Sequence, residues 1–172
     1  MDLRSFIRDV PDFPRKGILF KDITPLIGTP DAFHEAVRQM ADRVAKPDAV
    51  VAIESRGFIF GAPLAQLWNV PFVPARKFGK LPGRTVRQVY SLEYGEDTLE
   101  LHADSLRASW NVVVVDDLLA TGGTAAATIA LVRQLGAEVG ATLFAVELDG
   151  LGGRAKLAPT RVEALMTFEV KE

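Results

Sequence analysis

The fold class of this chain is decided by one stretch, Val112-Val113-Val114-Val115-Asp116-Asp117-Leu118-Leu119-Ala120-Thr121-Gly122-Gly123-Thr124. Its four consecutive valines are typical of a strand buried on both faces in the middle of a parallel sheet, where apolar and polar residues no longer alternate. Two aspartates follow where that strand is expected to end. Because carboxylates are costly to bury unless they are paired, we expect them at the carboxyl edge of the sheet, where open α/β sheets bind ligands.

A candidate phosphate-binding loop follows the two aspartates. Residues 121–124 lead into an Ala-rich segment that should be helical, and the backbone N–H groups of a helix N-terminus favour phosphate. Carboxylates for sugar hydroxyls and amides for a phosphate together suggest a site for a ribose 5-phosphate. The alternative is a buried strand that runs into a capped helix with solvated aspartates, which explains neither the paired acids nor the Thr-Gly-Gly-Thr sequence. The endings typical of nucleotide P-loops and dinucleotide-binding loops are absent.

The composition limits the class of protein. A length of 172 residues with 48% hydrophobic content suits one domain. With 20 basic and 22 acidic residues the net charge is -2, which gives no overall field that would attract nucleic acid or a membrane. The lack of cysteine excludes disulfides and thiolate catalysis and suits a reducing compartment. We therefore expect a cytoplasmic protein with neither a secretory signal nor a membrane span.

Turn signals divide the chain into short alternating segments, which is the pattern of βα units. Two βαβ units separated by an insertion predict an α/β fold with a central, mostly parallel sheet flanked by helices. The expected elements are a helix starting at Thr29-Pro30-Asp31 and closed by Pro47, strands over 49–53, 72–74, 111–115 and 139–148, and helices over 57–68 and 124–135 with Gly136 as C-cap.

The insertion between the two units predicts a β-hairpin. Apolar and polar residues alternate from Tyr90 to Tyr94, residues 95–97 suggest a turn, and the alternation resumes at Leu99 and Leu101. Because this hairpin precedes the strand that carries the aspartates, it could fold over their edge of the sheet as a lid that excludes water.

Several segments together resemble a known family. Residues 112–124 match the phosphoribosyl-diphosphate-binding motif of the type I phosphoribosyltransferases, and the rest of the chain resembles the adenine phosphoribosyltransferases among them. The resemblance covers nearly the whole chain in the family's order, which is more specific than any single motif. The segments that carry it are residues 17–25, 54–58, 76–83, 90–95 and 146–148, followed by Gly153-Arg154.

The resemblance implies a fold and a reaction. It implies one type I phosphoribosyltransferase domain over residues 1–172, with 1–30 and 145–172 in a small base-binding hood and 76–102 forming a basic loop and hairpin lid. The implied reaction transfers the 5-phosphoribosyl group from phosphoribosyl diphosphate to adenine, giving AMP and diphosphate. Mg²⁺ would be held mainly through the phosphoribosyl diphosphate substrate, and the enzyme would be a homodimer.

The resemblance also assigns roles around the sugar. Asp116 and Asp117 would hydrogen-bond the ribose hydroxyls, and their negative charge would favour a transition state that resembles an oxocarbenium ion. The 5-phosphate would be wrapped by the loop of Ala120, Thr121, Gly122, Gly123 and Thr124.

Two basic segments are candidates for binding diphosphate. Ser55 and Arg56 follow an expected strand and open a helix, so Arg56 could hold diphosphate bidentately, although an ordinary helix cap with a surface arginine is the alternative. Arg76, Lys77 and Lys80 belong to the chain's densest positive run, for which a solvated loop is the alternative. The resemblance favours diphosphate ligands in both segments. It further implies an unusual, strained peptide at Ser55-Arg56 and an Arg76 that reaches into the neighbouring subunit's site.

The resemblance assigns the base site as well. Phe20 and Leu148 would sandwich the adenine ring, and backbone groups near Lys21 would read its N1 and N6 edge. Glu93 would exchange a proton at purine N7 as the catalytic acid or base. Without the resemblance, Phe20 would be a core residue and Glu93 an exposed acid on a half-buried strand.

Two other functions stay open. One is a related phosphoribosyltransferase that uses hypoxanthine, guanine or xanthine. The other is a regulatory protein that senses phosphoribosyl diphosphate and binds nucleic acid, which the acidic net charge and the lack of an attached DNA-binding segment disfavour.

Overall fold

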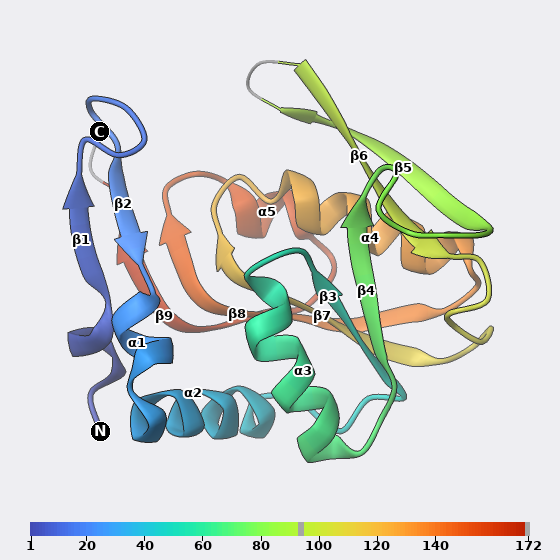
Figure 1. Cartoon of the computed structure of the whole chain (residues 1–172), viewed down its shortest axis with the longest axis horizontal. Helices are drawn as coiled ribbons and strands as arrows, with labels where there is room; N and C mark the ends of the chain where they lie inside the picture. The colour runs from blue at the N-terminus through green and yellow to red at the C-terminus, as the bar shows by residue number, and fades with distance from the viewer. Residues whose placement is uncertain (93–94, 171–172) are drawn as a thin grey trace. The chain divides into compact units, whose positions relative to one another are not determined.

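The computed structural model describes residues 1–92 and 95–170 (Figure 1). The chain forms two structural units, Met1–Gln39 and Met40–Glu172. Within the described part of the chain, no helix combines the length and the apolar character needed to cross a membrane.

The first unit is built around a small antiparallel hairpin. Strands β1 (Arg8–Pro11) and β2 (Leu19–Asp22) pair from Arg8 opposite Asp22 to Pro11 opposite Leu19. A short 3-10 helix (Leu3–Phe6) precedes this hairpin, and helix α1 (Thr24–Gly28) follows it. Helix α2 (Pro30–Asp42) starts with proline as its first residue, as the sequence predicts, and crosses into the second unit before it ends.

The second unit contains a seven-stranded sheet with strand order β5-β6-β4-β3-β7-β8-β9. Neighbours from β4 to β9 are parallel, and the β5–β6 hairpin adds two antiparallel strands beside β4. Helices α3 and α4 cover opposite faces of the sheet (Figure 1), as two right-handed crossovers that run in opposite directions require. The fold class predicted from the sequence is confirmed. The elements are β3 (Ala49–Ile53), α3 (Gly57–Trp68), β4 (Phe72–Lys77), β5 (Thr85–Leu92), β6 (Gly95–His102), β7 (Asn111–Leu119), α4 (Gly123–Gln134), β8 (Glu138–Asp149), α5 (Gly153–Leu157) and β9 (Val162–Glu169).

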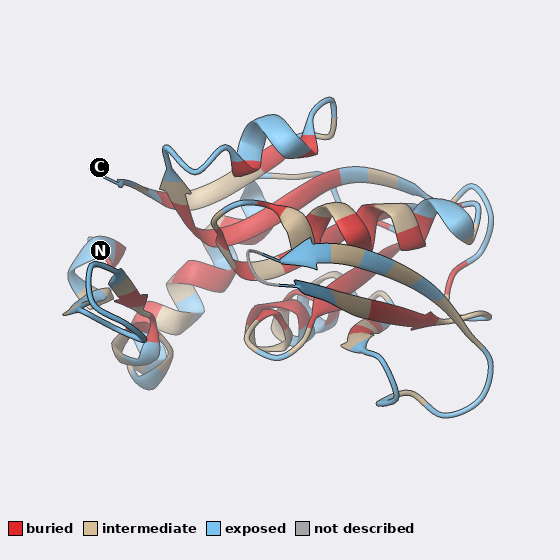
Figure 2. Cartoon of the chain, turned by 90° about the horizontal axis from the view of Figure 1, so that it is seen from above, coloured by how far each residue is buried: buried red, intermediate tan, exposed pale blue. Residues whose placement is uncertain are grey.

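The core lies on the central strands, as the run of valines predicts. Every residue of β3 is buried, and residues 112–115 of β7 are at most 2% exposed (Figure 2). Burial on both faces explains why these strands show no polar alternation. Helix α4 ends in the predicted way: Gly136 has φ +80°, its N–H donates to Arg133 O, and the Ala137 N–H donates to Val132 O.

The structure corrects two expectations about strands. The strand of valines does not end at the aspartates, because β7 continues to Leu119 and pairs with β8 as far as Glu147. Only the pairing with β3 stops at Val115. The long β8 supplies backbone partners that the sequence of β7 does not reveal.

The predicted hairpin turn is also misplaced. Residues 95–97 belong to β6, where Gly95 pairs with Leu92 and Asp97 pairs with Tyr90. The hairpin begins earlier than expected, with Thr85 opposite His102. Glycine and acidic residues suggest a turn locally, but the register of the two strands overrides that preference.

Candidate active site

A cavity of about 360 Å³ lies in the second unit, where β3 and β7 separate beyond Val115. This is the carboxyl edge of the parallel strands, the place where open α/β sheets bind ligands. Five strands of the sheet, β3 to β7, the loop after β3 and the start of α4 contribute to the cavity wall. The lining residues are Ile53, Glu54, Ser55, Arg56, Lys77, Tyr90, Leu92, Asp97, Leu99, Asp116, Asp117, Leu118 and Thr124.

The two aspartates form a compact acidic pair in this cavity. The Asp117 backbone N–H donates to Asp116 Oδ1 at 2.9 Å. The Arg56 guanidinium Nε lies 2.8 Å from Asp117 Oδ2, and the Asp117 side chain is only 5% exposed. Asp117, which is predicted to bind the sugar, and Arg56, which is predicted to bind diphosphate, are therefore ion-paired with each other.

Burial controls the ionisation of this pair. Burial raises the pKa of Asp116 well above its ordinary value, and the negative charge of Asp117 raises it further. Burial also raises the pKa of Asp117, although Arg56 opposes the shift. The pair is thus a buried acidic site that a positive charge or several hydrogen-bond donors would stabilise.

The loop between β3 and α3 is packed tightly against the aspartates. A side chain at Gly57 would place its Cβ 2.8 Å from Val115 O and 2.9 Å from Asp116 Oδ1. Only glycine allows the first turn of α3 to approach β7 this closely, and that approach brings Arg56 to Asp117. The unusual peptide expected at Ser55-Arg56 lies one bond earlier, because the cis peptide joins Glu54 and Ser55.

The predicted phosphate loop surrounds a smaller cavity of about 100 Å³. Asp116, Leu118 and Thr124 line both this cavity and the larger one, so the two spaces share a wall. The backbone N–H groups at the start of α4 belong to this loop, since the helix begins at Gly123. The lining residues of the smaller cavity are Asp116, Leu118, Leu119, Ala120, Thr121, Gly122, Gly123, Thr124, Ala125 and Phe144.

The phosphate loop rests on the start of α5. A Cβ at Gly153 would lie 2.2 Å from Ala120 O, and one at Gly122 would lie 3.0 Å from Gly153 O. Next to this contact, Arg154 binds Glu147 of β8 through two hydrogen bonds, of 2.9 and 2.6 Å. In the sequence, Gly153 and Arg154 stand out only through the family resemblance. The fold shows that they lie beneath the phosphate loop.

Glu54 contacts the three basic residues of the segment 76–80. Its side chain accepts hydrogen bonds from Lys80 Nζ, at 2.8 Å, and from the Lys77 backbone N–H. Arg76 Nη2 lies 3.5 Å from the same carboxylate. Burial alone would raise the pKa of Glu54, but the hydrogen bonds from Lys80 and Lys77 outweigh burial and lower it. Glu54 is a residue to which the sequence assigned no role of its own.

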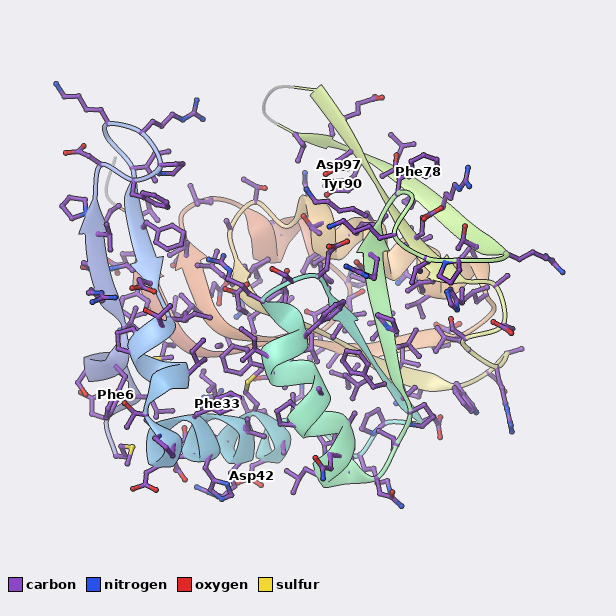
Figure 3. All side chains as sticks on the ribbon, viewed as in Figure 1. Phe6, Phe33, Asp42, Phe78, Tyr90 and Asp97 are labelled. Atoms are coloured by element: carbon purple, nitrogen blue, oxygen red, sulfur yellow. The ribbon has the colours of Figure 1, made fainter. Side chains whose placement is uncertain are left out.

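The hairpin contributes a second acceptor for these cations. Lys77 Nζ lies 2.9 Å from Asp97 Oδ2, and the Tyr90 hydroxyl donates to the same oxygen at 3.3 Å. Tyr90 and Asp97 lie next to each other on the hairpin (Figure 3). The hydrogen bond and charge of Asp97 raise the pKa of Lys77, which keeps it cationic. Each of the four predicted diphosphate cations thus has a carboxylate of the same chain within 4 Å.

The predicted base-binding residues lie in separate elements. Phe20 and Lys21 belong to β2, and Leu148 belongs to β8 of the second unit. The Phe20 ring meets Phe13 edge-on at 5.1 Å between ring centres. Lys21 Nζ lies 2.6 Å from Asp9 Oδ1, across the β1–β2 pair. The predicted catalytic Glu93 lies outside the described residues, so its role stays a prediction.

The carboxylates of the site do not form a metal cage. Among residues 1–92 and 95–170, no group of three or more His, Cys, Asp or Glu side chains is arranged to hold a metal ion.

Comparisons with known proteins agree on one family. The model of the phosphoribosyl transferase domain matches residues 31–164. The adenine phosphoribosyltransferase of Carboxydothermus hydrogenoformans is 52% identical over 170 residues, covering 98% of this chain and 100% of the relative.

Two solved structures are also similar to this chain. The adenine phosphoribosyltransferase of Thermoanaerobacter pseudethanolicus has a TM-score of 0.94 and 47% identity, covering 97% of this chain and 98% of its own. The enzyme of Saccharomyces cerevisiae, solved with an imino-altritol bisphosphate and adenine, has a TM-score of 0.90 and 42% identity, covering 95% of this chain and 96% of its own. The chain therefore belongs to the adenine phosphoribosyltransferase family of type I phosphoribosyltransferases.

Proposed function

We propose that this chain transfers the 5-phosphoribosyl group from phosphoribosyl diphosphate to adenine, giving AMP and diphosphate, and so acts in purine salvage. The observation that carries this proposal is the wall shared by the two cavities, in which Asp116 of the acidic pair stands with Thr124 of the helix-start loop. A ribose 5-phosphate needs acceptors for its hydroxyls next to donors for its phosphate, and these two features supply them. The adenine bound to the yeast relative supports adenine as the base.

The acidic pair would act on the sugar. Asp116 and Asp117 would accept hydrogen bonds from the ribose hydroxyls, which replaces the solvation that burial removes. The 5-phosphate would sit among Ala120, Thr121, Gly122, Gly123 and Thr124. As the bond from C1 to diphosphate breaks, positive charge develops on the sugar, and a fixed negative site stabilises that state more than the ground state.

The cations would act on the leaving diphosphate. Arg56, Arg76, Lys77 and Lys80 would exchange their carboxylate partners for phosphate oxygens. Of the predicted diphosphate ligands, Ser55, Arg56 and Lys77 line the cavity itself. Before substrate arrives, Glu54, Asp97 and Asp117 hold these side chains close to their working positions. Held cations lose less conformational entropy when diphosphate binds.

The base would be held by Phe20 and Leu148, with Lys21 reading the adenine edge through its backbone. The Lys21 ammonium is engaged with Asp9, which supports a backbone role for this residue. Glu93 would exchange a proton at N7 and make N9 a better nucleophile. Residues 1–30 and 145–172 would form the base-binding hood, and residues 76–102 the basic loop and lid.

Mg²⁺ would enter mainly with phosphoribosyl diphosphate, whose oxygens are hard ligands of the kind it prefers. The ion would neutralise diphosphate charge, and the carboxylates of the described chain would act on the sugar and the cations. We further propose a cytoplasmic homodimer in which Arg76 completes the neighbouring subunit's site. The Arg76 side chain is 34% exposed, so part of it is accessible to a neighbouring subunit, which supports this role.

A comparison of four bases tests the proposal. Initial rates of nucleotide formation from phosphoribosyl diphosphate should be highest with adenine when hypoxanthine, guanine and xanthine are offered in parallel. A preference for a 6-oxopurine would identify the related purine enzyme instead. A gel-shift assay run beside the turnover assay addresses the regulatory alternative, which requires nucleic-acid binding without turnover.

A further inference from the structure

The connection between β4 and β5 carries the basic loop, residues 78–84, and its two ends are tied to one buried side chain. Glu100 lies on β6, the strand between β4 and β5, opposite Arg76 on one side and Arg87 on the other. Glu100 is only 2% exposed. A carboxylate in such a place requires donors to replace water.

Three donors reach Glu100, one from the start of the loop and two from β5. The Gly79 backbone N–H donates to Oε2 at 3.0 Å. The Thr85 hydroxyl and Arg87 Nε donate to Oε1 at 2.9 and 2.8 Å. Gly79 stands at the start of the loop and Thr85 directly after its end, so this one carboxylate closes the loop at its base.

A ring contact strengthens the same closure. The Arg87 guanidinium that binds Glu100 also lies over the Phe78 ring, 4.5 Å from its centre. Phe78 is the first residue of the loop, and its backbone N–H donates to Thr98 O on β6. The loop base is therefore fixed from β6 by both backbone and side-chain contacts.

The fixed ends of the loop determine where the Lys80 ammonium group lies. Lys80 follows Gly79 directly, and its Nζ reaches Glu54 at the end of β3, 2.8 Å away in the cavity wall. Lysine has a long, flexible stem, so its position depends on where the backbone starts.

We propose that Glu100 is a positioning residue that holds the base of the loop and thereby places Lys80 for the diphosphate. This inference rests on the proposed function. Burial would raise the pKa of Glu100, but Thr85, the Gly79 N–H and Arg87 lower it, so the carboxylate is ionised in the conditions of the reaction. The charge matters because all three contacts are donors.

Glu100→Gln is the informative variant, since it keeps the size of the side chain and removes the charge. One oxygen becomes an NH₂ group, which faces a donor and cannot accept from it. The KM for phosphoribosyl diphosphate should rise about ten-fold, as expected when a hydrogen bond to a buried charge is lost. The KM for adenine should stay within about two-fold of wild type, because the loop does not touch the base in the proposed site.

A double-mutant cycle with Lys80→Ala separates positioning from general destabilisation. If Glu100 acts through Lys80, Glu100→Gln should raise the KM for phosphoribosyl diphosphate by less than about two-fold in the Lys80→Ala background. Equal factors in both backgrounds would overturn the inference. Glu163→Gln is the matched control, because Glu163 on β9 also binds an arginine, Arg161, at 2.8 Å and does not line the cavity. The KM values of this variant should match those of wild type.

Hydrogen exchange gives a readout that does not depend on turnover. In Glu100→Gln, amides of residues 78–84 should exchange faster than in wild type, with the Gly79 amide most affected. Unchanged exchange there would overturn the inference whatever the kinetics. Absence of AMP formation by wild type would instead overturn the proposed function, so the two failures are distinguishable.

Discussion

At the residue scale, Asp117 is proposed to bind the ribose, but the burial of its carboxylate is unfavourable for folding. Replacing Asp117 with asparagine removes a buried charge and leaves Arg56 able to turn to water, since its side chain is 41% exposed. We expect Asp117→Asn to fold, to raise the KM for phosphoribosyl diphosphate and to lower turnover, together by about 10²-fold in kcat/KM. Steady-state kinetics and thermal unfolding check this prediction. Wild-type kinetics in a folded variant would reject the ribose role.

The ionisation of the same pair predicts a pH dependence. Burial raises the pKa of Asp116 and Asp117 above the usual 3.8, so the folded state keeps a proton at a pH where the unfolded chain has released it. The pair should therefore favour folding more as the pH falls through the raised pKa. Activity should change in the opposite direction, because the ribose hydroxyls need ionised acceptors.

A pH profile tests this assignment. The kcat/KM for phosphoribosyl diphosphate should fall on the acid side with an apparent pKa above 3.8, and Asp116→Asn should remove or shift that limb. An acid limb that is identical in the variant would assign the titration to another group.

At the element scale, the start of α5 supports the phosphate loop. A Cβ at Gly153 would lie 2.2 Å from Ala120 O, a backbone atom that cannot move without displacing the loop. We expect Gly153→Ala to cost about 1–3 kcal/mol of unfolding free energy and to raise the KM for phosphoribosyl diphosphate. Chemical denaturation and steady-state kinetics provide the two measurements.

Gly140→Ala is the matched control for this prediction. A Cβ at Gly140 would lie 2.4 Å from the Asn111 side-chain oxygen, and a side-chain amide on the surface can turn away. This variant should keep wild-type kinetics. If both variants behaved alike, the contact between α5 and the loop would not matter to binding.

The hairpin gives a second prediction at this scale. Asp97 holds Lys77 through an exposed ion pair, and such pairs contribute about 0–1 kcal/mol to stability. Asp97→Asn should leave the unfolding free energy within about 1 kcal/mol of wild type, and inhibition of the variant should need up to about three-fold more diphosphate, because Lys77 is no longer held close to its working position. Stronger inhibition would show that Asp97 competes with diphosphate for the lysine and does not prepare it.

Much of this arrangement could be predicted at the level of elements. The bounds of β3 and α3 and the buried valines of β7 follow from local periodicity, because each element is encoded within its own residues. The predicted positions of the end of β7 and of the hairpin turn were wrong, since both depend on pairing with strands elsewhere in the chain. Glu54 and Glu100 escaped notice for the same reason. Their partners lie 13 to 26 residues away.

At the scale of the whole molecule, Arg76 connects one subunit with its neighbour's site in the proposed homodimer. Its Nη2 lies 3.5 Å from Glu54 of the same chain, while its side chain stays 34% exposed. A guanidinium has five donors and can bridge an acid of its own chain and a ligand of another. The proposed homodimer therefore makes a prediction that concerns two different subunits.

Complementation between two inactive variants tests that prediction. Arg76→Ala and Asp117→Asn should each form dimers with little activity. When the two are unfolded, mixed in equal amounts and refolded, half of the dimers should be hybrids. Each hybrid would combine an intact Asp117 with its neighbour's intact Arg76 in one of its two sites, so activity should recover to about a quarter of wild type. If Arg76 serves its own subunit, every site in every dimer carries one defect, and mixing restores nothing. Sedimentation of the refolded sample, which should show dimers throughout, distinguishes that result from a failure to reassociate.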